Sequence, residues 1–191
     1  MAAGVVYNES NFGVEKELYA IDSGYRSQGG FNLETAGLPA GSHIPVLAPL
    51  HIDFVNRKAS LVNRLKVVEA ATKGATSIKV QKNSFAKAGT YAVSESNIVT
   101  VSKVDTSNEA YDVLTVTATT ADIALGAILY ESDTAGKVVK TANALNYART
   151  KVETGATVTA LYRAYEIQEK ELYIPVTEAD KTSLTSRFMF V

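Results

Sequence analysis

The chain has 191 residues, 46% of them hydrophobic and 20% charged, a balance typical of a folded globular protein and not of a disordered one. The formal charge of -1 provides no overall field to attract nucleic acid, and no stretch approaches the ~20 apolar residues of a membrane-spanning helix. Cysteine is absent, which excludes disulfides, thiolate metal sites and cysteine nucleophiles.

Residues 1–48 are predicted to form an extended N-terminal arm. Glycine and proline are concentrated there and alternate with aromatic residues, so turns and single anchors are expected instead of long strands. We expect the arm to pack wherever its aromatic side chains meet a surface. The sequence leaves open whether that surface belongs to this chain or to a neighbour.

Residues 49–191 are predicted to form a β domain organised around a central block at 75–131. In this block Val, Ile, Thr and Tyr recur at every second position between polar breaks, which indicates successive short strands. The polar loop at 105–110 separates two such runs as in an antiparallel hairpin. Residues 59–70 fit either strands or a short helix, and we favour strands. The expected fold is a small antiparallel β-barrel or sandwich.

The C-terminal third is expected to add a hairpin and a helix. Residues 146–167 read as two strands around a turn at 153–155, and alternation places Arg163, Tyr165 and Ile167 on one face of the second strand. Thr177 and Asp180 resemble a capping box, which predicts a short helix over 178–186. Four apolar residues, 188–191, end the chain and are expected to be buried, in the core or under another subunit.

Residues suited to catalysis are scattered. His43 and His51, the only histidines, do not have the spacing of a ligand pair, and no metal or cofactor site is predicted. Glu166, Glu169 and Glu171 lie close in sequence and leave a glycosidase as an alternative, although a solvated face explains them better. We therefore expect a non-catalytic protein with no catalytic residues.

Several segments resemble the head decoration and head-fibre proteins of tailed bacteriophages, which sit on the outside of icosahedral capsids. The likeness is greatest to such proteins of phages of gut Bacteroidetes, including the crAss-like phages. It includes the motifs IDSGYRSQGGFNLETAG, NEAYDVLTVT and SRFMFV, and the matching stretches are 21–59, 74–93, 108–117, 144–184 and 186–191.

The resemblance implies a structural virion protein that is made in the host cytoplasm and stabilises the assembled lattice from the outer surface of the capsid. It implies the major capsid protein as partner, a homo-oligomer with a trimer favoured, other head-fibre or auxiliary proteins as further candidates, and neither nucleic acid nor membrane. The residues that we expect to contact capsid or another subunit are aromatic, arginine or leucine: Tyr19, Tyr25, Arg26, Phe31 and Leu33 in the arm, and Tyr162, Arg163 and Tyr165 in the hairpin.

A surface-binding module of the virion is the alternative function. Such an adhesin would bind a glycan or a receptor through its loops, and the loops at 105–110 and 131–137 are the candidates.

Overall fold

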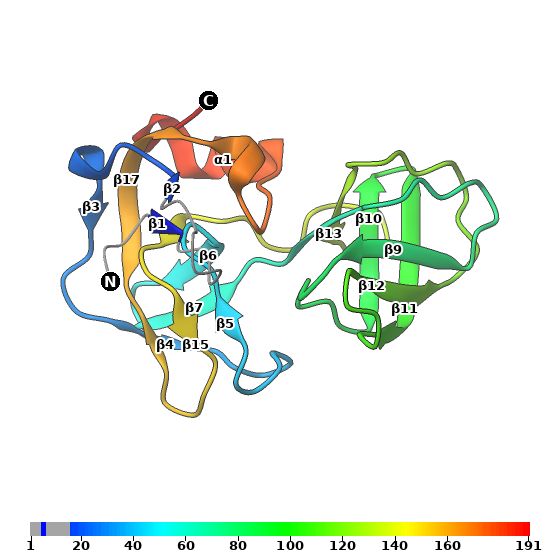
Figure 1. The fold of residues 1–191 in the computed structure, drawn as a ribbon, viewed down its shortest axis with the longest axis horizontal. Coiled ribbons are helices and arrows are strands. Elements are labelled where there is room, and N and C mark those ends of the chain that lie inside the picture. The colour runs from blue at the N-terminus through cyan, green and yellow to red at the C-terminus, as the bar shows by residue number, and fades with distance from the viewer. Residues whose placement is uncertain (1–4, 7–15) are drawn as a thin grey trace. The chain divides into compact units, whose positions relative to one another are not determined.

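The computed structural model describes residues 5–6 and 16–191 and is mainly β. The beginning of the predicted arm, residues 1–4 and 7–15, lies outside the described residues. The chain divides into two units (Figure 1): unit 1 contains Met1–Val62 and Thr141–Val191, and unit 2 contains Asn63–Lys140. Along the sequence, unit 2 is therefore an insertion within unit 1.

Unit 2 is a small antiparallel β-barrel. Its strands are β8 (Arg64–Lys66), β9 (Ser77–Gln81), β10 (Gly89–Ser94), β11 (Asn97–Asp105), β12 (Tyr111–Val116) and β13 (Ile128–Glu131). They pair in the order β8-β13-β10-β11-β12-β9, and every pair is antiparallel. The two edge strands then meet through an antiparallel bridge between Val67 and Val80 and a 3.0 Å hydrogen bond from the Val68 amide to the Lys79 carbonyl.

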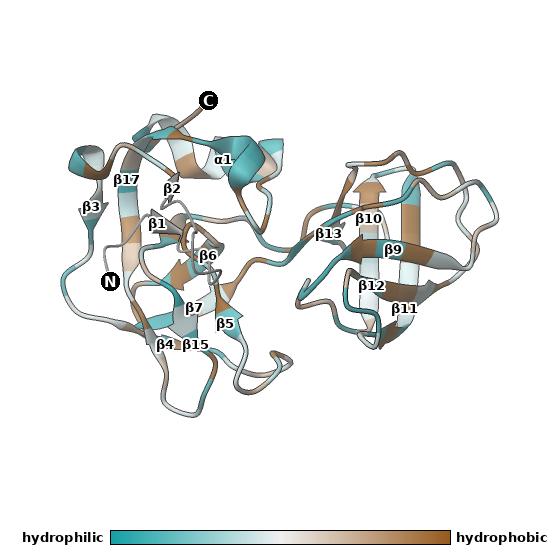
Figure 2. Ribbon diagram, in the orientation of Figure 1, coloured by the Kyte–Doolittle hydropathy of each residue, from teal (hydrophilic) through white to brown (hydrophobic). Residues whose placement is uncertain are grey.

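The alternation of apolar residues explains this barrel. In β12, Leu114 and Val116 point inward and Thr115 outward, as a strand with one buried face requires. Apolar segments accordingly line the strands of unit 2 in Figure 2. The core contains Leu65, Val67, Ala71, Ile78, Val80, Tyr91, Val99, Val101, Leu114, Val116, Ile123 and Leu129. The predicted β block at 75–131, the hairpin at 105–110 and the choice of strands for 59–70 are confirmed.

Unit 1 is built on a larger mixed sheet. Its strands are β1 (Val5–Val6), β2 (Lys16–Glu17), β3 (Tyr25–Arg26), β4 (Phe31–Leu33), β5 (His43–Ile44), β6 (Pro49–Asp53), β7 (Lys58–Leu61), β14 (Ala144–Asn146), β15 (Thr150–Lys151), β16 (Thr157–Val158), β17 (Ala160–Ile167) and β18 (Phe188–Phe190). The main sheet has the order β16-β4-β7-β6-β14-β17-β18, with β3 also paired to β17. Two small ladders, β1-β2 and β15-β5, complete the unit.

The division of the chain differs from the predicted arm and β domain. Residues 16–44 do follow an extended path of short strands, but they pair with the rest of unit 1: β4 runs parallel to β7 and antiparallel to β16, and β5 pairs with β15. Phe31 and Ile44 are fully buried there. The surface on which these anchors pack therefore belongs to this chain, because the apolar area that they bury is gained within unit 1.

The predicted hairpin at 146–167 forms only at its base. Leu145 pairs with Leu161 between β14 and β17, and the Tyr147 amide donates to the Thr159 carbonyl at 2.9 Å. Nearer the turn the two strands separate, since β15 pairs with β5 and β16 with β4. Strand β17 thus has neighbours on both sides, as expected for a strand with apolar groups on both faces.

The C-terminal helix α1 spans Glu178–Leu184 and begins with the predicted capping box, in which Thr177 and Asp180 bond each other's backbone amides. A 3-10 turn, Thr185–Arg187, follows and leads into β18. Phe188 is buried in the unit 1 core, but Met189 and Val191 are exposed. Met189 and Val191 therefore lie outside the core of this chain, because a strand turns successive side chains to opposite faces, and their burial under another subunit stays a prediction.

The core of unit 1 draws on both halves of the unit. It contains Leu18, Tyr19, Leu47, Val62, Ala142, Leu145, Leu161, Ala164, Ile167, Leu172, Val176, Leu184 and Phe188.

Candidate functional site

The candidate site lies where β3 pairs with β17 in unit 1. Just before β3 the chain makes a 3-10 turn, Ile21–Ser23, followed by Gly24. A β-carbon on Gly24 would lie 2.9 Å from the ring of Tyr19, which is itself 2% exposed. The buried Tyr19 ring and the small Gly24 therefore fix where β3 starts. Burial also raises the pKa of the Tyr19 hydroxyl to about 12, so the phenol is neutral at ordinary pH.

Ser23 fastens this turn to β17. Its hydroxyl donates to the Ala20 carbonyl at 2.6 Å and accepts the Tyr165 amide at 2.8 Å. The Ala20 amide donates to the Tyr165 carbonyl at 3.0 Å, and Arg163 Nε approaches the Ser23 carbonyl at 3.4 Å. Both backbone groups of Tyr165 are thus held by the turn that precedes β3.

A bulge in β17 determines which side chains face outward. Glu166 has a φ of 57°, and the pairing with β18 shifts register between Ala164 and Ile167. Tyr165 lies before the bulge and is exposed, like Arg163, whereas Ile167 lies after it and is buried. The prediction that Ile167 shares a face with Arg163 and Tyr165 is therefore wrong. A left-handed residue other than glycine carries strain on the order of 1 kcal/mol, and bulges often reorient side chains at functional sites.

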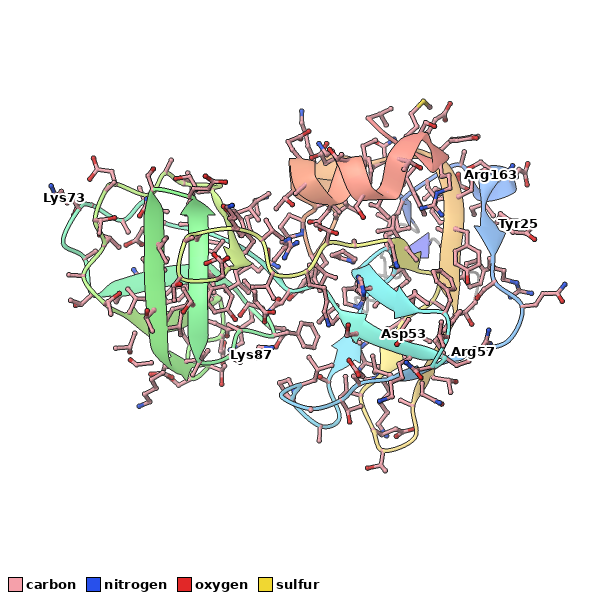
Figure 3. All side chains as sticks on the ribbon, turned by 180° about the vertical axis from the view of Figure 1, so that it is seen from behind. Tyr25, Asp53, Arg57, Lys73, Lys87 and Arg163 are labelled. Carbon is pink, nitrogen blue, oxygen red and sulfur yellow. The ribbon has the colours of Figure 1, made fainter. Side chains whose placement is uncertain are left out.

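One arginine thus lies near two tyrosines, and we call these three residues the arginine–tyrosine cluster (Tyr25, Arg163 and Tyr165). The Arg163 guanidinium carbon lies 5.9 Å from the centre of the Tyr25 ring and 6.0 Å from that of Tyr165. Tyr25 is 60% exposed and Tyr165 38% exposed, and Figure 3 shows Tyr25 beside Arg163. Within residues 5–6 and 16–191, Arg163 has no carboxylate within ion-pairing distance.

A second arginine next to the cluster also rests on an aromatic ring. Arg26 is opposite Leu161 in the β3–β17 pairing, and its guanidinium carbon lies 5.1 Å from the centre of the Tyr147 ring. Such cation–π contacts stabilise an exposed arginine by roughly 0.5–1 kcal/mol and restrict its motion.

The structure brings together only some of the predicted contact residues. Tyr25, Arg163 and Tyr165 form the cluster, with Arg26 beside it. Tyr19, Phe31 and Leu33 are buried, and Tyr162 is half-buried with its ring centre 5.9 Å from that of Phe54. Sequence reasoning missed Ser23, Gly24 and Glu166, which position the cluster. The dipeptide Ser23-Gly24 was the one available signal, since this pair is common in turns.

Comparison of the chain with protein-family models, curated proteins and solved structures gives no match.

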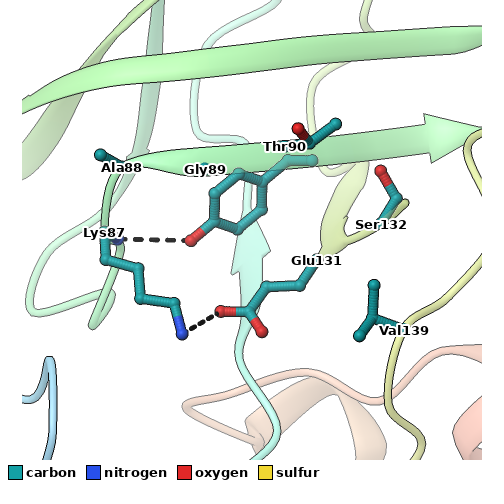
Figure 4. Close-up of a pocket in the computed structure, with 8 residues that line it drawn as sticks. Lys87, Ala88, Gly89, Thr90, Glu131, Ser132 and Val139 are labelled. Carbon is teal, nitrogen blue, oxygen red and sulfur yellow. Dashed lines mark hydrogen bonds and ion pairs between the residues drawn. The ribbon is translucent and has the colours of Figure 1, made fainter. Parts of the chain in front are cut away.

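Unit 2 holds a separate pocket, of about 180 Å³, beside the predicted loop at 131–137 (Figure 4). Lys87 Nζ pairs with Glu131 Oε1 at 2.9 Å at its side, and the Lys87 amide donates to the Tyr91 hydroxyl at 3.3 Å. Ser132 is buried and its hydroxyl has no hydrogen-bond partner in the described part of the chain. The pocket is smaller than the roughly 300–1,000 Å³ of sites for drug-sized ligands.

The other loop candidate, 105–110, is held by its own contacts. Lys82 Nζ donates to the carbonyls of Thr106 and Asn108 at 2.5 and 2.7 Å, and pairs with Asp112 at 3.2 Å. Asp112 is buried and also accepts the amide and hydroxyl of Ser84. These contacts account for the shape of the loop without a ligand.

The residues considered for catalysis or metal binding are distributed over unit 1. Glu169 pairs with Lys181 at 2.9 Å, whereas Glu166 is exposed at the bulge. His51 lies on β6, and its Nδ1 is 3.0 Å from the Thr141 carbonyl oxygen, whereas His43 lies on β5. Among residues 5–6 and 16–191, no group of three or more His, Asp and Glu could hold a metal ion. No helix in the same residues is long and apolar enough to span a membrane.

Proposed function

We propose that the chain is a structural virion protein that binds the exterior of a tailed-phage capsid, as a head decoration or head-fibre base protein, through the arginine–tyrosine cluster of unit 1. The observation that carries the proposal is an exposed arginine whose guanidinium carbon lies about 6 Å from the ring centres of two exposed tyrosines, on neighbouring strands. The resemblance of five segments to auxiliary capsid proteins supplies the kind of partner.

Residue type and rigidity both favour this cluster as a binding surface. Tyrosine and arginine are enriched among the few interface residues that dominate binding free energy. The Tyr165 backbone is bonded to the turn before β3 on both its amide and its carbonyl, so little motion is lost on binding. A preorganised surface of this kind suits association between two folded proteins.

The proposed mechanism is mass action. Each copy binds the assembled lattice of the major capsid protein and not its free subunits, so bound copies lower the free energy of the assembled state. The proposal includes a homo-oligomer, with a trimer favoured, on the outer surface of the virion. It requires no catalytic group, and other head-fibre proteins are further candidate partners.

Co-sedimentation with purified, assembled capsid shells tests the proposal. We expect saturable binding at a copy number set by the symmetry of the lattice. Tyr25→Ala should weaken binding by about tenfold or more, as for a residue of an interface hot spot. Tyr173→Ala is the matched control, because Tyr173 is a comparably exposed tyrosine of unit 1 outside the cluster. Absence of the parent protein from the pellet would refute the capsid-binding role.

A second candidate function is glycan or receptor binding through unit 2. The specific observation in its favour is the pocket beside loop 131–137, where the buried Ser132 hydroxyl has no partner among the described residues. A glycan array is the direct measurement. Binding that is abolished by Ser132→Val would support the adhesin, and an array without hits at high protein concentration would exclude glycans.

A further inference from the structure

We infer that the arginine–tyrosine cluster recognises a carboxylate side chain, Asp or Glu, on an acidic segment of the partner protein. The inference rests on the proposed function for the kind of partner. For the chemistry it rests on the guanidinium of Arg163, which has no carboxylate partner among residues 5–6 and 16–191.

The first argument is the hydrogen-bonding capacity of Arg163. A guanidinium has five N–H donors in a planar fork. In the described part of the chain only Nε makes a hydrogen bond, a long one of 3.4 Å to the Ser23 carbonyl, and both terminal nitrogens are left for a ligand. The fork matches a carboxylate, which can accept two parallel N–H bonds.

The second argument is that the two rings hold the fork in place. The Arg163 guanidinium carbon lies about 6 Å from the ring centres of Tyr25 and Tyr165. These cation–π contacts restrain the arginine side chain, which otherwise has much rotamer freedom. Both rings and Arg163 remain exposed, so a ligand can reach the guanidinium. Their hydroxyls provide further donors for the remaining lone pairs of a carboxylate.

The third argument is local charge. Arg26 follows Tyr25 directly on β3 and, like Arg163, has no carboxylate within ion-pairing distance among the residues described. The cluster and its neighbour therefore present two guanidinium groups without an ion pair among the described residues, although Asp22 and Glu166 are close to them in sequence. A polyanion such as nucleic acid would require many phosphate contacts, whereas a single acidic side chain requires only this fork.

Capsid shells and the full-length protein provide the first arm of the test. Arg163→Lys keeps the positive charge but removes the fork, so we expect about tenfold weaker binding to shells. Arg187→Lys is the matched control, because Arg187 is also an exposed arginine of unit 1 that rests on one ring, that of Phe188. Unchanged binding of Arg163→Lys to shells would overturn the inference while the capsid-binding role stands.

A second arm does not depend on capsid. The probe is a short capped peptide of alternating Gly and Asp, compared with its Gly-Asn counterpart, and the readout is the NMR signals of the Arg163 Nε–H and of the Tyr25 and Tyr165 amides. We expect saturable shifts in the millimolar range with the acidic peptide only. Equal shifts with both peptides, or no shifts, would overturn carboxylate recognition.

The two arms separate the two claims. If the parent protein does not bind shells but the acidic peptide produces the expected shifts, the capsid role fails and carboxylate recognition stands. A phosphoserine peptide, added as a further probe, would overturn the inference if it alone shifted the cluster signals. The amide spectrum of Arg163→Lys, compared with that of the parent, establishes that the variant is folded.

Discussion

Replacement of Asp180 by Asn should selectively destabilise unit 1, because this carboxylate joins α1 to the strand region that follows unit 2. Asp180 is fully buried. One oxygen accepts the Ala142 amide at 3.0 Å, and the other accepts the Thr177 amide at 3.0 Å and the Thr177 hydroxyl at 2.7 Å. Asparagine has nearly the same shape but only one acceptor oxygen.

The magnitude follows from these three contacts. Whichever way the amide is turned, at least one buried N–H donor loses its acceptor, which costs about 1–3 kcal/mol. The hydrogen bonds that remain are weaker because their acceptor no longer carries the carboxylate charge, and together they contribute about 1 kcal/mol less to the free energy of unfolding. We therefore expect a loss of roughly 3 kcal/mol in the free energy of unfolding of unit 1.

Native-state hydrogen exchange measures this loss separately in each unit. The amides of Asn143 and Asn146, bonded to the carbonyls of Leu50 and Ala48, should exchange with a correspondingly lower opening free energy. The opening free energies of amides in unit 2 should not change. Asp53→Asn, at an exposed turn, should have a much smaller effect than Asp180→Asn. Unchanged protection in unit 1, or an equal fall in both units, would refute the reasoning.

Two further predictions concern unit 2. Burial raises the pKa of the Tyr91 hydroxyl to about 12, so above about pH 10 this tyrosine ionises more readily in the unfolded chain than in the folded one. Its contribution to the free energy of unfolding should be constant below about pH 10 and fall by up to about 3 kcal/mol as the pH rises to about 12. Unfolding monitored by circular dichroism measures this fall, and Tyr91→Phe should remove the part of the pH dependence that is due to Tyr91. Residues 63–140, produced as a separate chain, should fold alone. Unit 1 should fold when a linker of about four residues replaces residues 63–140, because β7 and β14 pair with Leu50 of β6 from its two sides and are therefore roughly 10 Å apart. An unfolded amide spectrum for either protein would contradict this prediction.

Much of the fold was accessible from sequence where the structure is local. The strands of unit 2 are consecutive in the chain, and their alternating apolar residues bury one face, as at Leu114 and Val116. The helix α1 has its capping box at Thr177 and Asp180, a signal that is complete within four residues. The β10–β11 and β11–β12 pairings and the cap lie close along the chain, so there pattern and structure agree, whereas β8–β13 and β9–β12 pair at longer range.

Unit 1 was less accessible because its pairings are distant. Strand β17 pairs with β3, β14 and β18, which come from three separated parts of the chain. Alternation alone does not specify these neighbours. Burial of Phe31 in the same unit likewise depends on pairing of β4 with β7 and with the distant β16. Because the sequence around Phe31 does not reveal these partners, it predicts an extended arm.

The candidate site was predicted by residue type but not by arrangement. Tyr25, Arg163 and Tyr165 belong to types favoured at interfaces, and the structure brings these three together. Alternation alone places Arg163 and Tyr165 on one face of β17, but the bulge at Glu166 that turns Ile167 into the core was not predictable, because glutamate has no preference for a positive φ. The hydrogen bond from the Tyr165 amide to the Ser23 hydroxyl spans more than a hundred residues and has no local sequence pattern.

The insertion of unit 2 also bears on how the chain folds during synthesis. Before β14 emerges, β6 has only β7 beside it and lacks its second partner. The later contact between His51 and the Thr141 carbonyl closes a very long loop. Unit 2 is continuous and can fold first. Its ends are then held together by the 2.9 Å hydrogen bond from Arg64 to the Lys140 carbonyl. That connection shortens the effective loop between β7 and β14 from about eighty residues to a few. The entropic contribution to the free energy of closing this loop falls by roughly 2–3 kcal/mol. We therefore expect the inserted barrel, once folded, to favour the folding of the unit that surrounds it in sequence.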